Sequence, residues 1–314
     1  MKEQSTKTAA KKKFFKMVFS RAGIFVILIL IQMLVFLGIP YYLKEYATFI
    51  YSAMTVMEIV VLVYIINTEG NPAFKLTWIL CVMALPVIGT IFYIYVHLQL
   101  ETRFVQNRLA ALRMETEPYM DQDQKITDAL WAGKSANAQL SYYLSHQLGF
   151  PTYRNTEVEY FPVGEAKFAS MIKELEKAEK FIFMEYFIVE EGIMWDTILE
   201  ILKRKAEEGV EVRFMYDGMC AFDLLPYNYP KKLQKFDIKC KMSNKIRPFV
   251  STIQNNRDHR KICVIDGQVG YVGGVNLADE YINEKERFGH WKDTAVLLRG
   301  DAVQSLTMIF LQMW

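Results

Sequence analysis

A histidine, a lysine and an aspartate stand in the spacing H-x-K-x4-D at His259, Lys261 and Asp266, and a Gly-Gly-x-Asn segment containing Gly274 and Asn276 follows. An imidazole can attack phosphorus or pass a proton near neutral pH, and a neighbouring ammonium supplies the positive charge that phosphodiester oxygens require. The whole pattern would arise by chance in a chain of this length with a probability below about 10⁻⁵. It therefore predicts a site that cleaves or transfers phosphodiesters, in which a nucleophile lies beside an anion clamp.

A β-hairpin is the element that must position these residues. Residues 261–266 form an apolar run that ends in Asp-Gly, and residues 269–272 return after it, which is typical of a hairpin whose first strand carries the site. Residues two apart on a strand point the same way, so His259 and Lys261 are expected side by side on one face. Asp266 has an odd offset from both, and we expect it to orient or electrostatically support a histidine rather than to touch the substrate.

The residues after the hairpin complete the predicted phosphate site. The amide of Asn276 can donate to a phosphate oxygen, and Gly274 with its neighbouring glycine allows the backbone to approach closely. No metal or other cofactor is implied, because Lys261 takes the place of the cation that a two-metal phosphodiesterase uses. An exposed histidine and a solvated lysine on an ordinary hairpin are the alternative, which the joint spacing disfavours.

An α/β fold is predicted around the hairpin, because helical and extended patterns alternate from residue 149 onward. Glu185 and Asp217 fall at predicted strand ends, where they could serve the site or cap turns equally well, and they are left out of the catalytic set. The expected helices lie at residues 129–148, 168–178 and 193–208, and the expected strands at residues 181–189, 210–216, 238–242 and 294–298.

Three apolar runs at residues 22–42, 47–66 and 76–96 precede this region, and each approaches the ~20 residues that a membrane-spanning helix needs. Basic residues before the first run favour a cytoplasmic N-terminus by the positive-inside rule. Three spans would place the rest of the chain across the membrane. However, Pro86 and Gly89 interrupt the third run. The alternative is therefore that one of the three segments does not cross the membrane completely.

The chain is therefore expected to have four parts, of which the last is a catalytic lobe. They are a basic cytoplasmic N-terminus at residues 1–21, a transmembrane anchor at 22–98, a connector with a helical segment at 99–148 and the catalytic lobe at 149–314. The protein as a whole is expected to be a multi-pass protein of the cell membrane. A formal net charge of +2 is too small to favour nucleic acid as a partner, since sequence-independent binding depends on many basic contacts.

The H-x-K-x4-D segment resembles the HKD motif of the phospholipase D superfamily, and residues 180–189, 206–218, 259–267, 273–281 and 291–293 are similar to blocks of the bacterial cardiolipin synthases. The resemblance implies a phospholipase D-like lobe with a β-sheet flanked by helices. It also implies a phosphatidyltransferase that makes cardiolipin and glycerol from two phosphatidylglycerol molecules through a phosphatidyl-histidine.

The family builds its site from two HKD motifs, whereas this chain carries one. The resemblance therefore implies that a second lobe is needed, from a C-terminal half or from a second protomer, and the chain is expected to be the first half of a longer enzyme and inactive alone. Two alternatives stay open: a related phospholipase D-type enzyme that uses water or serine as acceptor, and a non-catalytic membrane protein with half a site.

Overall fold

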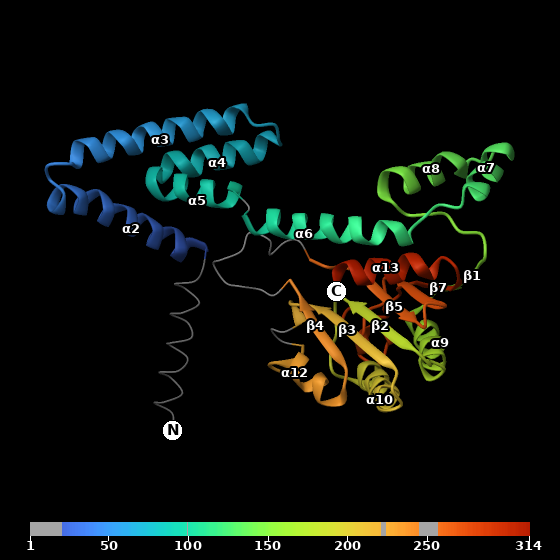
Figure 1. The fold of residues 1–314 in the computed structure, drawn as a ribbon. Helices are drawn as coiled ribbons and strands as arrows, with labels where there is room; N and C mark the ends of the chain where they lie inside the picture. The colour runs from blue at the N-terminus through green and yellow to red at the C-terminus, as the bar shows by residue number, and fades with distance from the viewer. Residues whose placement is uncertain (1–20, 99, 221–223, 245–256) are drawn as a thin grey trace, which may run out of the picture. The chain divides into compact units, whose positions relative to one another are not determined.

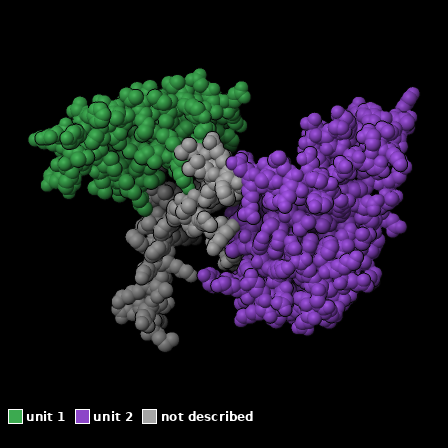
Figure 2. Space-filling model, viewed as in Figure 1, with its two compact units in different colours: residues 1–100 green, residues 101–314 purple. Residues whose placement is uncertain are grey.

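A computed structural model describes the chain at residues 21–98, 100–220, 224–244 and 257–314. The chain divides into two compact units, residues 1–100 and 101–314, which Figure 2 shows in different colours. The segment predicted as a connector, residues 99–148, falls almost entirely within the second unit. Its helices are therefore part of the unit that carries the motif.

Unit 1 contains four helices among its described residues: α2 (Arg21–Tyr42), α3 (Ala47–Asn67), α4 (Pro72–Ala84) and α5 (Pro86–Leu98) (Figure 1). Its small core joins Val61 and Ile65 of α3 to Val82 of α4 and Tyr93 of α5. Most other large apolar side chains of these helices are exposed. One helix, α3, is long and apolar enough to cross a membrane among the described residues.

The third apolar run does not form one helix. It breaks at Leu85, between α4 and α5, and each of these helices has 13 residues. Gly89 lets α5 fold closely against α4, because a Cβ at this position would lie 2.6 Å from the carbonyl oxygen of Cys81. Thirteen helical residues cover about 20 Å, against a hydrocarbon thickness of about 30 Å. The prediction of a continuous third span is therefore wrong.

Unit 2 begins with helical segments and continues into a mixed sheet. The helical part comprises α6 (Leu100–Thr116), the 3-10 turn η1 (Glu117–Tyr119), α7 (Gln124–Ala132) and α8 (Asn137–Leu148). The single helix predicted from residue 129 to 148 is thus two helices. Gly133 ends α7, and Gly149 ends α8 with a positive φ of 71°.

Seven strands among the described residues make one sheet in the order β1-β7-β6-β5-β2-β3-β4. Strands β2, β3 and β4 are parallel to one another, whereas β2-β5, β5-β6, β6-β7 and β7-β1 are antiparallel pairs. Their bounds are β1 (Thr156–Phe161), β2 (Phe181–Tyr186), β3 (Glu211–Asp217), β4 (Lys239–Ser243), β5 (Lys261–Ile265), β6 (Val269–Gly273) and β7 (Ala295–Gly300). The predicted α/β class is confirmed.

Helices cover both faces of the sheet, as Figure 1 shows. Helices α9 (Gly164–Glu176) and α10 (Ile193–Glu207) pack with the larger core on one face, and α13 (Val303–Met313) packs on the other against Phe183, Ile262 and Val264. The central strand β2 is buried on both sides, which explains its nearly continuous apolar sequence. The remaining short elements are α12 (Tyr229–Leu233), η2 (Gln234–Phe236) and η4 (Asp279–Ile282).

Candidate active site

The predicted hairpin is confirmed as strands β5 and β6. Three residues, 266–268, connect the strands; Asp266 and Gly267 are the central residues of the turn with φ values of 53° and 69°, and the backbone N–H of Gln268 donates to the carbonyl oxygen of Ile265 at 3.1 Å. Two successive positive φ values define the turn that Asp-Gly favours. The turn sets the register of β6 on β5.

His259 and Lys261 lie together at the start of β5, as the spacing predicts. The Nζ of Lys261 donates to the backbone carbonyl oxygen of His259 at 2.6 Å, and it also lies 5.1 Å from the ring centroid of Phe187. The imidazole of His259 is exposed, with its centroid 4.6 Å from that of Phe187. Phe187 directly follows β2, the neighbouring strand. One aromatic ring therefore supports both the exposed imidazole and the ammonium.

Lys261 is held where it has little contact with water, since only 5% of the residue is exposed. Burial lowers the pKa of its ammonium from 10.5 to about 8, and the negative charges of Asp293 and Asp258 partly oppose that shift. A cation that has lost much of its hydration gains more from a bound anion than a fully solvated one does. Lys261 would therefore favour a bound anion strongly, and the prediction that this anion is a phosphodiester oxygen stays a prediction.

Asn276 is fixed by two hydrogen bonds that join separate parts of the site. Its Oδ1 accepts from the backbone N–H of Ile188 at 2.9 Å, and its Nδ2 donates to the hydroxyl of Tyr281 at 2.7 Å. An amide nitrogen has two N–H groups, so one remains for a further acceptor. The predicted donation to phosphate is compatible with this orientation and stays a prediction.

Gly274 lies against a carboxylate that sequence reasoning missed. A Cβ on Gly274 would come within 1.9 Å of Oδ1 of Asp293, so a side chain there would displace this carboxylate. Asp293 accepts from the backbone N–H of Thr294 at 2.8 Å, and its charge acts on Lys261. The signal available in the sequence was the Trp-Lys-Asp block at residues 291–293, which the resemblance singled out without a role.

Asp266 does not orient His259. Its carboxylate accepts three backbone N–H bonds at the start of β2, from Glu179 at 2.8 Å, Lys180 at 2.7 Å and Phe181 at 2.8 Å. Asp266 follows the whole five-residue strand β5. It therefore lies about 17 Å from Lys261 at a rise of about 3.3 Å per residue. Asp266 therefore does not support His259 and fastens the opposite end of the strand instead, so that support of a different histidine stays a prediction.

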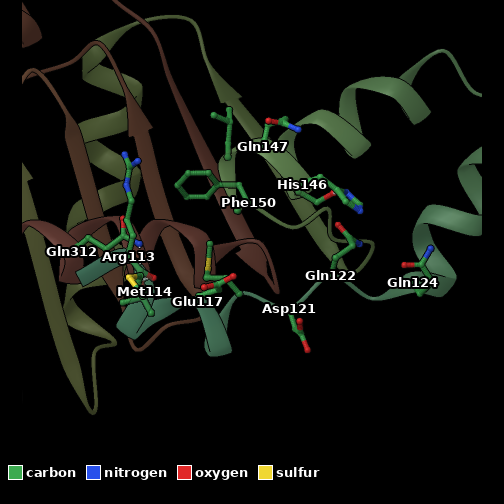
Figure 3. A pocket seen from close by; sticks show the side chains of 15 residues that line it. Arg113, Met114, Glu117, Asp121, Gln122, Gln124, His146, Gln147, Phe150 and Gln312 are labelled. Carbon is green, nitrogen blue, oxygen red and sulfur yellow. Dashed lines mark hydrogen bonds between the residues drawn. The ribbon is translucent and has the colours of Figure 1, made fainter. Parts of the chain in front are cut away.

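Two cavities lie in the second unit. The one drawn in Figure 3 has a volume of about 540 Å³, and its lining includes Arg113, Glu117, His146 and Gln312 but none of the predicted site residues. A second cavity of about 400 Å³ is lined by apolar residues of α6 and α13 together with Arg260, Lys261 and Gly273. The second cavity therefore adjoins the motif.

Family comparison agrees with the fold. Residues 171–314 match the family model described as cardiolipin synthase, PLD-like domain, and residues 58–96 match the phospholipase D-nuclease N-terminal model. The resemblance to the cardiolipin synthases of the phospholipase D superfamily is thereby confirmed, and the second unit is a phospholipase D-like α/β lobe.

Individual relatives place the chain more closely. It is 33% identical over 274 residues to a cardiolipin synthase of Alkalihalophilus pseudofirmus, an alignment that covers 84% of this chain and 53% of that protein. It is 49% identical over 251 residues to an uncharacterized protein of Streptococcus mutans serotype c, covering 80% of this chain and 54% of that protein. The chain thus spans about half the length of these relatives. Among solved structures, NucT from Helicobacter pylori aligns with a TM-score of 0.40 at 12% identity, over 51% of this chain and 96% of NucT.

Proposed function

We propose that this chain provides the site of a membrane-bound phosphatidyltransferase that makes cardiolipin and glycerol from two phosphatidylglycerol molecules. The observation that carries the proposal is the pairing of an exposed imidazole with a buried ammonium on the strand that matches the cardiolipin synthase domain. Similarity to curated cardiolipin synthases over most of the chain supports the choice of phospholipid as substrate.

The proposed reaction has two displacements at phosphorus. The imidazole of His259 attacks the phosphorus of the first phosphatidylglycerol, the bond to the glycerol oxygen breaks, and glycerol leaves with a proton from a general acid. A headgroup hydroxyl of the second phosphatidylglycerol then attacks the phosphatidyl-histidine, gives its proton to the same group, and frees His259. Lys261 stabilises the charge on the non-bridging oxygens in both steps, and Asn276 contributes its remaining N–H.

A separate acid is needed because His259 cannot attack phosphorus and protonate the leaving oxygen at once. The other histidines of the chain are His97, His146 and His290, and none of them begins an H-x-K-x4-D motif: His290 is followed by Lys292, but Leu297 stands where the aspartate would be. We propose that the acid is a histidine of a second phospholipase D-like lobe, either within the same protein or in a second protomer. A two-fold arrangement would supply it in the second case.

We propose that unit 1 anchors the site in the bilayer. Helix α3 has 21 residues, most of them apolar, and is about 31 Å long. This length matches the hydrocarbon thickness of a bilayer, which is about 30 Å. The apolar helix α2 could span beside it as a second pass, and the hydroxyl of Tyr51 on α3 already donates to the carbonyl oxygen of Phe36 on α2 at 2.5 Å. Because substrates and product are lipids, an anchored site searches the membrane plane rather than bulk water.

The test uses carbonate-washed membranes from cells that express the protein as its gene encodes it, supplied with phosphatidylglycerol labelled in the headgroup. We expect labelled cardiolipin and free glycerol without an added nucleotide-activated lipid. His259→Ala should abolish both products, whereas His146→Ala on the exposed surface of α8 should not. Formation of phosphatidic acid alone would favour water as acceptor, and no turnover of phospholipid by the wild-type membranes would refute the proposal.

A further inference from the structure

Behind the motif lies a buried group of charged side chains that the proposed reaction does not use. Asp258 and Arg260 alternate with His259 and Lys261 along the chain, and the two pairs have different partners: the first pair contacts Asp217 and Glu185, whereas the second contacts Phe187. Glu185 of β2 is 1% exposed and Asp217 of β3 is fully buried. In each strand, every second side chain points toward α13: Phe183 of β2 and Met215 of β3 pack there. Glu185 and Asp217 lie two residues further along the same strands and therefore point to the same side.

Asp217 holds the two residues that precede His259. Its Oδ2 accepts from the backbone N–H of Asp258 at 3.3 Å, and its Oδ1 accepts from Nη1 of Arg257 at 3.3 Å and from the backbone N–H of Met219 at 2.9 Å. Nη1 of Arg257 also donates to the carbonyl oxygen of Asn244 at 2.9 Å. The end of β3 thereby fixes the backbone one residue before the imidazole.

Glu185 holds the residue that follows His259. Its Oε1 accepts from Nη1 of Arg260 at 3.3 Å, and Nε of Arg260 lies 3.5 Å from Oδ1 of Asp258. Burial raises the pKa of Glu185 to about 9, and a hydrogen bond to Asp258 together with the charge of that residue adds to the effect. Its Oε2 has no hydrogen-bond partner among the described residues. We infer that the carboxyl of Glu185 is protonated and shares its proton with the carboxylate of Asp258.

The charges of the group balance once Glu185 carries that proton. Two ionised carboxylates, Asp217 and Asp258, then face two guanidinium groups, Arg257 and Arg260. The described residues contain no group of three His, Cys, Asp or Glu side chains arranged to hold a metal ion. The arrangement is that of a closed ion-pair network, in which removing one member leaves another buried charge unpaired.

We propose that Glu185 and Asp217 are positioning residues that hold the segment at residues 257–260 from behind, and so fix the imidazole of His259 against Phe187. Because Nζ of Lys261 donates to the carbonyl oxygen of His259, a shift of this segment displaces the nucleophile and the anion clamp together. This inference rests on the proposed function where it is tested by kcat, and on the geometry alone where it is tested by chemical modification of His259.

The kinetic test compares substitutions that differ in the contacts they keep. Glu185→Gln remains neutral, can accept from Arg260 and can donate to Asp258, so its kcat at pH 7 should stay within about threefold of wild type. Asp217→Asn loses the ionised acceptor, and we expect kcat to fall at least about tenfold with little change in KM, because the nucleophile is misplaced while Lys261 still binds substrate. Glu211→Gln, at the other end of β3 and bonded to Arg213 and Lys239, is the matched control and should leave kcat unchanged.

A chemical readout separates this inference from the proposed function. Diethyl pyrocarbonate acylates accessible histidines, and peptide mass mapping gives the rate at His259 with His146 as internal standard. Asp217→Asn should change the rate at His259 by at least about threefold and leave His146 unchanged, even if no cardiolipin is formed. Arg257→Gln removes the same contact from a side chain that is 15% exposed, and it should also change the rate at His259 by at least about threefold, which provides the test if Asp217→Asn does not fold. Folded variants with wild-type rates at His259 would overturn the positioning role.

A second chemical readout concerns Glu185 and its proton. A carboxyl whose folded pKa exceeds its unfolded value of 4.5 contributes stability below pH 4.5, and this contribution is lost as the pH rises toward about 9. Asp258 and Arg260 face Glu185, and Asp217 and Arg257 lie behind them. The Tm of Glu185→Gln relative to wild type should therefore increase steadily from pH 5 to pH 9 in detergent. A difference that does not change with pH would show that Glu185 is ionised and that the shared proton is absent.

Discussion

Replacement of Asp266 should destabilise the lobe rather than impair its chemistry. The carboxylate of Asp266 accepts the backbone N–H groups of Glu179, Lys180 and Phe181, where the chain enters β2. The residue also has a φ of 53°, which Asp tolerates better than Ala. A catalytic reading of the third motif position predicts the reverse, namely lost turnover in a stable protein.

The contacts give the magnitude. A hydrogen bond to a charged group contributes about 1.5–3 kcal/mol, and we take about 1 kcal/mol for each of these partly exposed bonds. Three bonds and about 1 kcal/mol for the left-handed backbone give a loss of about 4 kcal/mol for Asp266→Ala. Asp266→Asn keeps one acceptor oxygen and the backbone tolerance, so a loss of about 1–2 kcal/mol is expected. In a unit of this size, 4 kcal/mol corresponds to a fall in Tm of about 8–16 °C.

The assay is thermal unfolding of the detergent-solubilised protein, with turnover measured well below each Tm. Asp237→Ala is the matched control, because Asp237 has a φ of 55° and its carboxylate makes no hydrogen bond among the described residues. It should lose only the backbone contribution of about 1 kcal/mol. An Asp266→Asn protein with wild-type Tm and turnover reduced at least about a hundredfold would refute the structural role.

Two further predictions concern the site itself. If Lys261 binds phosphate only as an ammonium, kcat/KM should fall about tenfold per pH unit above the lysine's pKa of about 8, whereas Lys261→Arg keeps its charge and should not show this decline. Both proteins carry Glu185→Gln as well, because this substitution removes the second group that titrates at alkaline pH. A decline of kcat/KM with the same midpoint in the two proteins would contradict the assignment to Lys261. Gly274→Ala should lower kcat at least about tenfold, because its methyl group would displace Asp293. Gly38→Ala is the control and should leave kcat unchanged, since no atom lies within 4 Å of the added carbon. Equal activities of the two variants, measured in parallel, would show that the position of Asp293 is unimportant.

Local signals in the sequence predicted the elements that form the site. The Asp-Gly turn, the apolar runs of β5 and β6 and the period-two rule placed His259 and Lys261 together, because these features depend on neighbours in the chain. The amphipathic pattern of α10 likewise gave its bounds within one residue. Strand β1 was missed, although polar and apolar residues alternate over residues 157–160; it is a short edge strand whose apolar residues Val158 and Tyr160 are exposed rather than buried in a core.

Contacts between distant segments could not be predicted in this way. The carboxylate of Asp266 meets backbone groups more than eighty residues earlier, and the pairing of Glu185 with Arg260 depends on β2 lying beside β5. The prediction of one continuous helix in the third apolar run was wrong for another reason. Mean hydropathy is averaged over the break at Leu85, and it contains no information on the close packing of α5 against α4 that Gly89 allows. Composition gives an apolar length, whereas a span requires an unbroken helix.

The fixed spacing of the motif has a structural cause in the register between β5 and β2. Lys261 pairs with Tyr186 at one end of β2, and Ile265 pairs with Ile182 near the other, so the four residues between Lys261 and Asp266 measure the length of the neighbouring strand. One residue more or fewer would move Lys261 to the opposite face of the sheet or pull Asp266 away from its three N–H donors. The aspartate of the motif therefore has a role in the sheet: it fixes the register that places His259 and Lys261 together at the other end of β5.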